Sequence, residues 1–129
     1  MTITRFDPFR EFAVFPRGSW VPAVDIFETP THDLVIKAEL PDVAREDVDV
    51  TVENNVLTLK GEKKLPADVK EDQFRRVERD YGTFSRSFTL PTFVDAGKVT
   101  ADFKNGVLTV RLPYREEAKP RSITVEVAA

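Results

Sequence analysis

Few residues of this chain are of the types that carry out chemistry, and none stands in a spacing that a known reaction requires. His32 is the only histidine, and it lies in the turn-like sequence Pro30-Thr-His-Asp33, which favours a solvated loop residue over a general base. Ser85 and Ser87 lack the glycine-flanked surroundings of a G-x-S-x-G nucleophile. Cysteine is absent, so the chain has no thiolate nucleophile, no disulfide and no cysteine-based zinc site.

Two further segments contain residues that bind phosphates or metals in other proteins. Gly61-Glu-Lys-Lys64 lacks both the glycine-rich lead and the Ser/Thr of a phosphate-binding loop. Asp42, Glu46, Asp47 and Asp49 form an acidic cluster that would hold calcium only with a ligand geometry that the sequence does not specify, and a solvated loop is the more common outcome. We therefore expect no enzyme activity, no catalytic residue, no cofactor and no metal.

The composition is that of a single soluble domain. The chain has 129 residues, of which 41% are hydrophobic and 32% charged, so it can bury a core without disulfides or metal. The net charge of −3, with both signs interspersed, shows no basic footprint for nucleic acid. No apolar run approaches the ~20 residues that cross a bilayer, and charges near the N-terminus exclude a secretion signal. These features favour a cytoplasmic protein that binds neither nucleic acid nor membranes.

Residues 99–113 contain the clearest structural signal. Val99, Ala101 and Phe103 alternate with polar residues, and a second alternating run follows the dipeptide Asn105-Gly106. Asn-Gly between two alternating runs is the strongest short signal for a β-hairpin, because both central residues of a type I′ turn need positive φ. Pro113 ends the second strand because it has no N–H for the ladder.

Other alternating segments predict an all-β domain. Strands are expected at residues 24–28, 34–40, 48–53, 57–61 and 84–90. The hairpin pattern also occurs twice, because residues 50–59 around Asn54-Asn55 resemble residues 101–110. Two such hairpins suit a sandwich in which each supplies one inner face, although a short pattern of this kind can also recur by coincidence.

Two segments interrupt this rhythm. Residues 63–81 are heavily charged, and a connection of this length is usually functional or disordered; within it, Phe74 to Arg79 have the character of a strand that pairs with something outside its own sheet. Arg86 shares a strand face with Phe84 and Phe88, so it needs a carboxylate partner or a place at an edge where its head reaches water.

The two ends of the chain are expected to be a flexible arm and a flexible tail. Phenylalanines recur every third residue in the arm, at Phe6, Phe9, Phe12 and Phe15, beside a short helix predicted from Pro8. The arm can pack on its own domain, but these aromatic residues exceed what two turns can bury, which favours an interface. The tail carries an alternating segment at residues 122–127, either the last strand of its own sheet or a strand for another subunit.

Six motifs in this order resemble the small heat-shock proteins and their α-crystallin domain. They are Asp7-Pro8-Phe9, Trp20-x-Pro-x-x-Asp25-Ile26, Glu39-Leu-Pro41, Arg76-x-Glu-Arg79 with Tyr81-Gly82-x-Phe84, Ala101-x-x-x-Asn-Gly106-Val-Leu108, and Lys119-Pro120-Arg121-x-Ile123-x-Val125. The resemblance covers nearly the whole chain. It implies an immunoglobulin-like antiparallel β-sandwich at residues 21–113, including a dimerisation loop at 63–81, between an arm at 1–20 and an extension at 114–129.

The resemblance also implies roles for particular residues. It predicts an oligomer anchor at Ile123 and Val125, with Val125 and Val127 as an overlapping second register. The anchor groove would comprise Val48, Val50, Val52, Val99, Ala101 and Phe103. The dimer interface would comprise Phe74, Arg75, Arg76, Val77, Glu78, Arg79 and Arg86. Client proteins would bind Phe6, Phe9, Phe12, Phe15 and Trp20.

These features together predict an ATP-independent holdase. It would be a homo-oligomer built from dimers that binds unfolding proteins and prevents their aggregation. The alternative is a co-chaperone or protein-binding module on a related sandwich. That alternative explains neither the phenylalanine arm nor the isolated Ile-x-Val tail.

Overall fold

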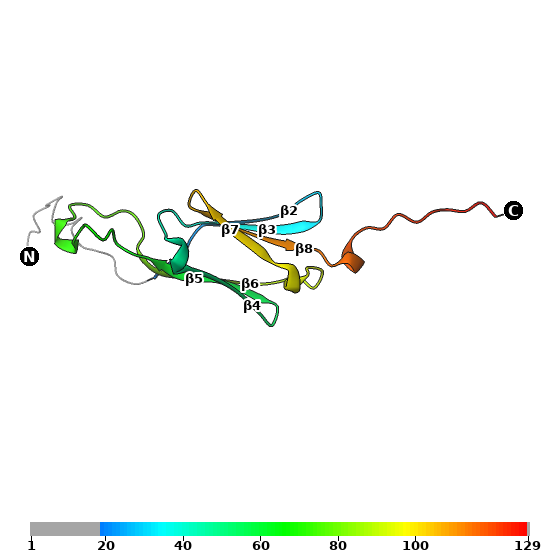
Figure 1. The fold of residues 1–129 in the computed structure, drawn as a ribbon, viewed down its shortest axis with the longest axis horizontal. Helices are drawn as coiled ribbons and strands as arrows, with labels where there is room; N and C mark the ends of the chain where they lie inside the picture. The colour runs from blue at the N-terminus through cyan, green and yellow to red at the C-terminus, as the bar shows by residue number, and fades with distance from the viewer. Residues whose placement is uncertain (1–18, 129) are drawn as a thin grey trace, which may run out of the picture.

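The computed structural model describes residues 19–128, which form two packed β-sheets with a long loop at one end and an extended tail at the other (Figure 1). The strands are β1 (Ser19–Trp20), β2 (Val24–Glu28), β3 (Asp33–Glu39), β4 (Val48–Glu53), β5 (Val56–Lys63), β6 (Gly82–Thr89), β7 (Thr100–Lys104) and β8 (Val107–Pro113). Short 3-10 turns lie between them: η1 (Arg45–Asp47), η2 (Glu71–Gln73), η3 (Ala96–Lys98) and η4 (Glu116–Ala118). This confirms the predicted β-sandwich.

Each sheet has four strands. One has the order β1-β6-β5-β4 and the other β2-β3-β8-β7, so β4 and β7 are both edge strands. The pairs are antiparallel except β1–β6, which runs parallel with Trp20 opposite Phe84. The sandwich is therefore not purely antiparallel. Its first strand also takes in the last two residues of the segment that the sequence assigned to the arm.

The two predicted hairpins are confirmed, and they lie in opposite sheets. Asn105 and Gly106 have φ values of 55° and 74°, and Asn54 and Asn55 have 52° and 61°. Asparagine and glycine tolerate this left-handed region better than other residues, so each turn occurs where the chain can make it. β4–β5 belongs to one sheet and β7–β8 to the other.

The core lies between the two inner faces. It contains Leu34, Ile36, Ala38, Leu40, Val43, Leu57, Leu59, Phe84, Leu90, Val94, Leu108, Val110 and Leu112. Most of these come from alternate positions of central strands, because successive side chains of a strand point to opposite faces. The outer faces carry the charged and hydroxyl residues between them.

The loop and the tail do not form the strands that their sequences favoured. Phe74 to Arg79 adopt irregular backbone after η2, and residues 122–127 form no strand. Figure 1 shows the green loop and the red tail extending from opposite ends of the sandwich. Neither segment lies beside an edge of its own sheets, so neither has a neighbouring strand to pair with. The tail is thus not the last strand of its own sheet.

Gly61 occupies a point of close approach between β5 and its surroundings. A Cβ at this position would collide with the carbonyl oxygen of Asp47 and would lie 2.7 Å from Cζ of Phe84. Phe84 is 2% exposed and belongs to the core. The collision is with backbone and a fixed ring, so neither neighbour can move aside easily.

We expect Gly61→Ala to destabilise the fold by about 1–3 kcal/mol, the usual cost of overpacking. Gly97→Ala is the matched control, because a Cβ there would meet only Oδ1 of Asp95 at 3.4 Å. Chemical denaturation of both variants measures the difference. Equal stability of the two variants would show that the backbone around Gly61 relaxes freely.

Candidate functional site

A groove lies between the edge strands β4 and β7. Its cavity of about 200 Å³ is lined by Arg45, Val48, Val50, Ala101, Asp102, Phe103 and Leu108. Four of the six predicted groove residues are therefore brought together in one place. Val52 and Val99 do not line the cavity, but both are partly buried and pack against the adjoining core.

The groove has two charged residues that the sequence analysis did not assign to it. Arg45 comes from η1, just before β4, and Asp102 stands between Ala101 and Phe103 on β7. Neither has an ion pair among the described residues. Arg45 lies within the acid-rich segment of residues 42–49. No neighbouring residue in the sequence indicates that its side chain lines this groove.

The side chains of the predicted anchor are exposed to solvent in the single chain. Ile123 is 82% exposed and Val125 is 87% exposed, and Val127 between them and the C-terminus is also exposed. Such exposure of three β-branched residues at alternate positions is unfavourable in water, because the apolar area is buried against nothing. The tail therefore has the character of a segment that is completed by a partner.

The root of the tail, in contrast, is held firmly to the sandwich. The backbone N–H of Tyr114 donates to the carbonyl of His32 at 3.0 Å, and that of Arg115 donates to the carbonyl of Phe93 at 2.8 Å. The Tyr114 ring packs on Phe93, with centroids 4.6 Å apart, and on His32, at 5.6 Å. Burial and a hydrogen bond to Glu28 raise the pKa of Tyr114. His32 is thus a half-buried packing residue and not the solvated loop residue predicted.

The loop residues predicted for the dimer interface make short-range contacts. Arg79 pairs with Asp42 at 3.0 Å, and Arg76 lies 3.8 Å from Glu78. Phe74 meets the ring of Tyr81 edge-on at 6.5 Å. Arg75 Nη1 donates to backbone carbonyls of residues 72, 73 and 74 at 3.3–3.5 Å, and Val77 is half-buried. These contacts hold the loop to itself and to its root, with no strand pairing.

The contacts of the Arg86 guanidinium differ from the carboxylate pair that the sequence analysis considered. Its Nη1 donates to the carbonyl oxygen of Pro22 at 3.1 Å, and its guanidinium lies 5.2 Å from the ring centre of Phe88. The partner is thus a backbone carbonyl and an aromatic face, not a carboxylate. The arginine ties β6 to the segment between β1 and β2, so it belongs to the sandwich of a single chain.

The edge strand β2 exposes apolar side chains that the sequence analysis did not select. β2 pairs only with β3, and Ile26 and Phe27 are both substantially exposed. They are consecutive, so they point to opposite faces of the strand. An edge with free hydrogen-bonding groups and apolar residues on both faces is a ready acceptor for another strand. In the sequence, the two consecutive apolar residues Ile26 and Phe27 were the feature that could have identified this exposed edge.

Trp20 is a part of the sandwich as much as a surface residue. Its Nε1 donates to the carbonyl of Gly82 at 3.0 Å, and its ring centre lies 5.3 Å from that of Phe84. Lys63 Nζ lies 5.8 Å from the Trp20 ring centre and 5.6 Å from that of Tyr81. Trp20, predicted to bind clients, is half-buried, and these contacts leave only part of it for a client.

Lys63 is the one buried charged residue in the described part of the chain, with an exposure of 4%. Burial and the nearby Arg79 lower the pKa of its ammonium group, and Asp42 and Asp80 oppose that shift. The faces of Trp20 and Tyr81 replace part of the lost hydration by cation–π attraction. The Lys63 ammonium group therefore lies where β1 meets the two ends of the 63–81 loop.

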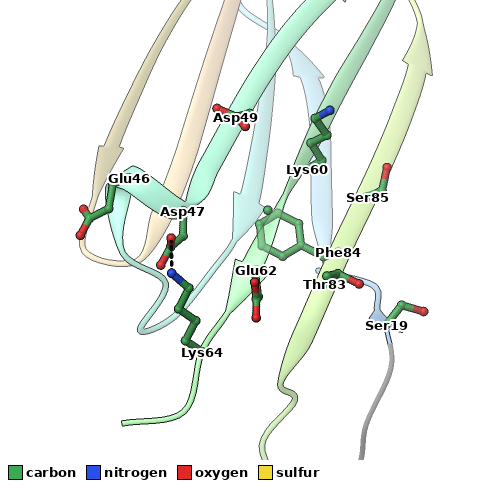
Figure 2. Close-up of a pocket in the computed structure, with 11 residues that line it drawn as sticks. Ser19, Glu46, Asp47, Asp49, Lys60, Glu62, Lys64, Thr83, Phe84 and Ser85 are labelled. Carbon is green, nitrogen blue, oxygen red and sulfur yellow. Dashed lines mark ion pairs between the residues drawn. The ribbon is translucent and has the colours of Figure 1, made fainter. Parts of the chain in front are cut away.

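Three acids of the cluster, Glu46, Asp47 and Asp49, line a hollow of about 500 Å³ that offers no catalytic arrangement, and Asp42 lies outside it (Figure 2). Asp47 pairs with Lys64 at 3.0 Å, while Glu46 and Asp49 are directed elsewhere. Ser85 lines the hollow with no histidine beside it. Among residues 19–128, no three carboxylates, histidines or cysteines are grouped as a metal would need.

Phe6, Phe9, Phe12 and Phe15 lie outside the described residues, as does the predicted helix from Pro8. Their role in client binding therefore remains a prediction from the sequence. Within the described part of the chain, no helix is long and apolar enough to cross a membrane.

The fold defines a class: a sandwich of two four-stranded β-sheets with open edge strands and a groove between two of them. The profile of the Hsp20/alpha crystallin family matches residues 26–128. The chain is 35% identical to small heat shock protein C2 of Rickettsia felis over 93% of its own length and 80% of that protein. It is 36% identical to small heat shock protein C4 of the same organism, of which it spans only 63%.

A solved structure agrees with these sequence relatives. The crystal structure of a small heat-shock protein from Xylella fastidiosa, described as having a distinct high order structure, matches with a TM-score of 0.71 and 40% identity over 84% of this chain and 98% of that one. The chain belongs to the Hsp20/alpha crystallin family, the small heat shock proteins. A chaperone role follows from that membership.

The Lys63 site can be followed through Trp20, which is the only tryptophan. We expect Trp20 emission to change in a step below pH 10.5, because the ordinary lysine value is lowered here and loss of the charge alters the field on the indole. Lys63→Met should abolish the step, and Lys60→Met, at an exposed position, should retain it. A step that survives in Lys63→Met would assign it to a tyrosine.

Proposed function

We propose that this chain is an ATP-independent holdase that assembles from dimers and covers the exposed apolar segments of unfolding proteins. The observation that carries the proposal is an exposed apolar tail and, in the same chain, a groove between two edge strands that is lined by valines, Phe103 and two charged residues; neither covers the other. The described residues provide apolar binding surfaces and no catalytic group. Burial of a client's apolar area, without chemistry, is thus the mechanism that fits.

The tail makes a weak tie to a neighbouring subunit. Complete burial of Ile123 and Val125 in the groove contributes roughly 3–6 kcal/mol. Ordering an extended segment offsets part of this gain. Several tails in one assembly act together through their effective concentration, so the whole is stable while each contact opens readily. Subunits of such an assembly exchange, which makes apolar surface available to clients.

The loop supplies a second, independent contact. Residues 64–81 leave the sandwich at the end remote from the tail, and Phe74 to Arg79 lack a strand partner in their own sheets. In a dimer this segment pairs with the open edge β2 of the other subunit, where it would cover Ile26 and Phe27. The contacts within the loop at Phe74 and Arg79 must rearrange for this to occur.

The phenylalanine arm is the client-binding segment in this proposal. Phe6, Phe9, Phe12 and Phe15 precede Trp20 at a regular spacing, and aromatic side chains bury large areas against many partners. The alternative, a co-chaperone or binding module that docks on one partner, uses neither the tail nor the arm. A homogeneous monomer in solution would favour that alternative.

The holdase activity is tested with a client that aggregates on heating. At equal subunit concentration, we expect the chain to reduce the light scattered by the client, with ATP removed by apyrase and equally with ATP added. Replacement of the four arm phenylalanines by serine should lower this suppression without changing the assembly's mass. Client scattering that is unchanged by the unaltered chain would refute the proposal.

Ile123→Gly combined with Val125→Gly should reduce the assembly towards dimers, because the tail then offers no side chain to the groove. Size exclusion with multi-angle light scattering measures the mass. The double change Ser122→Gly with Thr124→Gly is the matched control, since it loosens the same segment but keeps its apolar face. An unaltered mass for the first variant would exclude the anchor.

Deletion of Ala67 to Arg79 should yield monomers at concentrations where the full chain is dimeric. The root residues Lys63, Tyr81 and Trp20 remain, so the sandwich should unfold at about its original temperature. Sedimentation gives the mass, and calorimetry tests the fold. A persistent dimer would place the dimer contact outside the loop.

A further inference from the structure

Arg45 and Asp102 lie at different points along the groove between β4 and β7. The segment that leads to η1 starts beside the Asn105–Gly106 turn, because the N–H of Leu40 donates to the carbonyl of Gly106 at 2.7 Å. Arg45 is therefore at the end of the groove formed by Val48 and Phe103. β4 and β7 run in opposite directions (Figure 1), and Val48, Val50, Ala101 and Phe103 line one cavity, so the antiparallel order sets Val48 level with Phe103 and Val50 level with Ala101.

The tail carries opposite charges on either side of its apolar residues. Arg121 precedes Ile123 by two residues, and Glu126 directly follows Val125. β4 has the complementary order, with Arg45 before Val48 and Glu53 after Val52. Residues 121–126 span about 17 Å when extended, since five steps of roughly 3.3 Å join their ends, and residues 48–53 span the same length.

We propose that Arg45 and Asp102 fix the polarity and the register of the tail of a second copy in this groove. The tail lies with its C-terminal end at Arg45, so that Glu126 pairs with the guanidinium and Arg121 lies by Glu53. This inference rests on the proposed tail anchor and adds its direction. The reverse polarity places Arg121 against Arg45 and Glu126 against Glu53, two contacts between like charges.

Asp102 selects between the two overlapping registers. With Val125 level with Val48 and Ile123 level with Val50, the neutral Thr124 is opposite Asp102. In the second register the tail is shifted by two residues, so that Val127 is level with Val48. The carboxylate of Glu126 is then opposite Asp102. The first register brings Glu126 level with Asp47, whose charge is offset by Lys64 at 3.0 Å, and within reach of Arg45, whereas the second sets it opposite Asp102, which has no ion pair in the described part of the chain; Ile123 and Val125 therefore fill the groove.

The absence of cysteine permits a direct test on the full chain. R45C with E126C and R45C with R121C are two double variants treated with a short bismaleimide, and covalent dimers are counted on a denaturing gel. We expect the first pair to cross-link at least about fivefold faster. Equal rates, or a faster second pair, would overturn the polarity.

A charge cycle gives an independent measure. Arg45→Glu and Glu126→Arg should each raise the concentration at which the assembly half-dissociates by about three- to tenfold, and together they should restore it to within about twofold. Lys60→Glu, at an exposed position on the central strand β5, should neither weaken the assembly nor rescue Glu126→Arg. Additive losses in the double variant would overturn the ion pair.

The register is tested by Val127→Ser, which should leave the half-dissociation concentration unchanged, whereas Ile123→Ser should raise it. Equal losses would overturn the register. The glycine variant of Ile123 and Val125 separates the two levels of the argument. If it leaves the mass unaltered, the anchor itself fails; if it dissociates the assembly while the cross-linking is reversed, only the polarity and register fail.

Discussion

The structure depends on one constraint: two four-stranded sheets that pack face to face cover their inner sides but leave their edges open. β2, β4 and β7 each pair on one side only. Unpaired backbone groups at an edge attract other strands, and soluble proteins usually obstruct them with charge, twist or brevity. Here β1 is short, with two residues, whereas β2 has apolar residues on both faces and β4 borders a groove that reaches β7. The edges are therefore left open to partners, and both the loop and the tail are segments without a strand partner of their own.

Much of the fold could be predicted because it depends on local signals. Asn-Gly and Asn-Asn specify turns, and strict alternation specifies which face of each strand is buried, so the two hairpins and most of the core follow from short windows of sequence. The remainder depends on contacts across more than 60 residues. The parallel pairing of Trp20 with β6, the carbonyl of Pro22 beside Arg86 and the position of Arg45 at the groove have no local signature. The loop and the tail have sequences that suit strands but form none in the single chain, so their predicted pairing with another subunit remains a prediction.

The contacts of Lys63 connect the first strand of the sandwich with the two ends of the 63–81 loop. Trp20 lies on β1, Lys63 is the last residue of β5, and Tyr81 directly precedes β6 at the other end of the loop. A single ammonium group stacked between the two rings makes the positions of all three interdependent. Because that ammonium is buried and its pKa is lowered, a change in hydration at this point alters the balance of charge and aromatic contacts together. The first strand and the 63–81 loop are accordingly coupled through one side chain.

The firm root of the tail has a geometric consequence. Hydrogen bonds to the sandwich hold the chain as far as Arg115, and local hydrogen bonds and the Glu116–Lys119 ion pair form a turn that ends at Lys119, so three residues separate that turn from Ile123. The four steps from Lys119 to Ile123 reach roughly 13–14 Å when extended. If the tail anchors in a neighbour's groove as we propose, that groove must lie within this distance of the turn. The length of this connection would then limit the spacing between subunits, and a few added residues would permit a wider spacing.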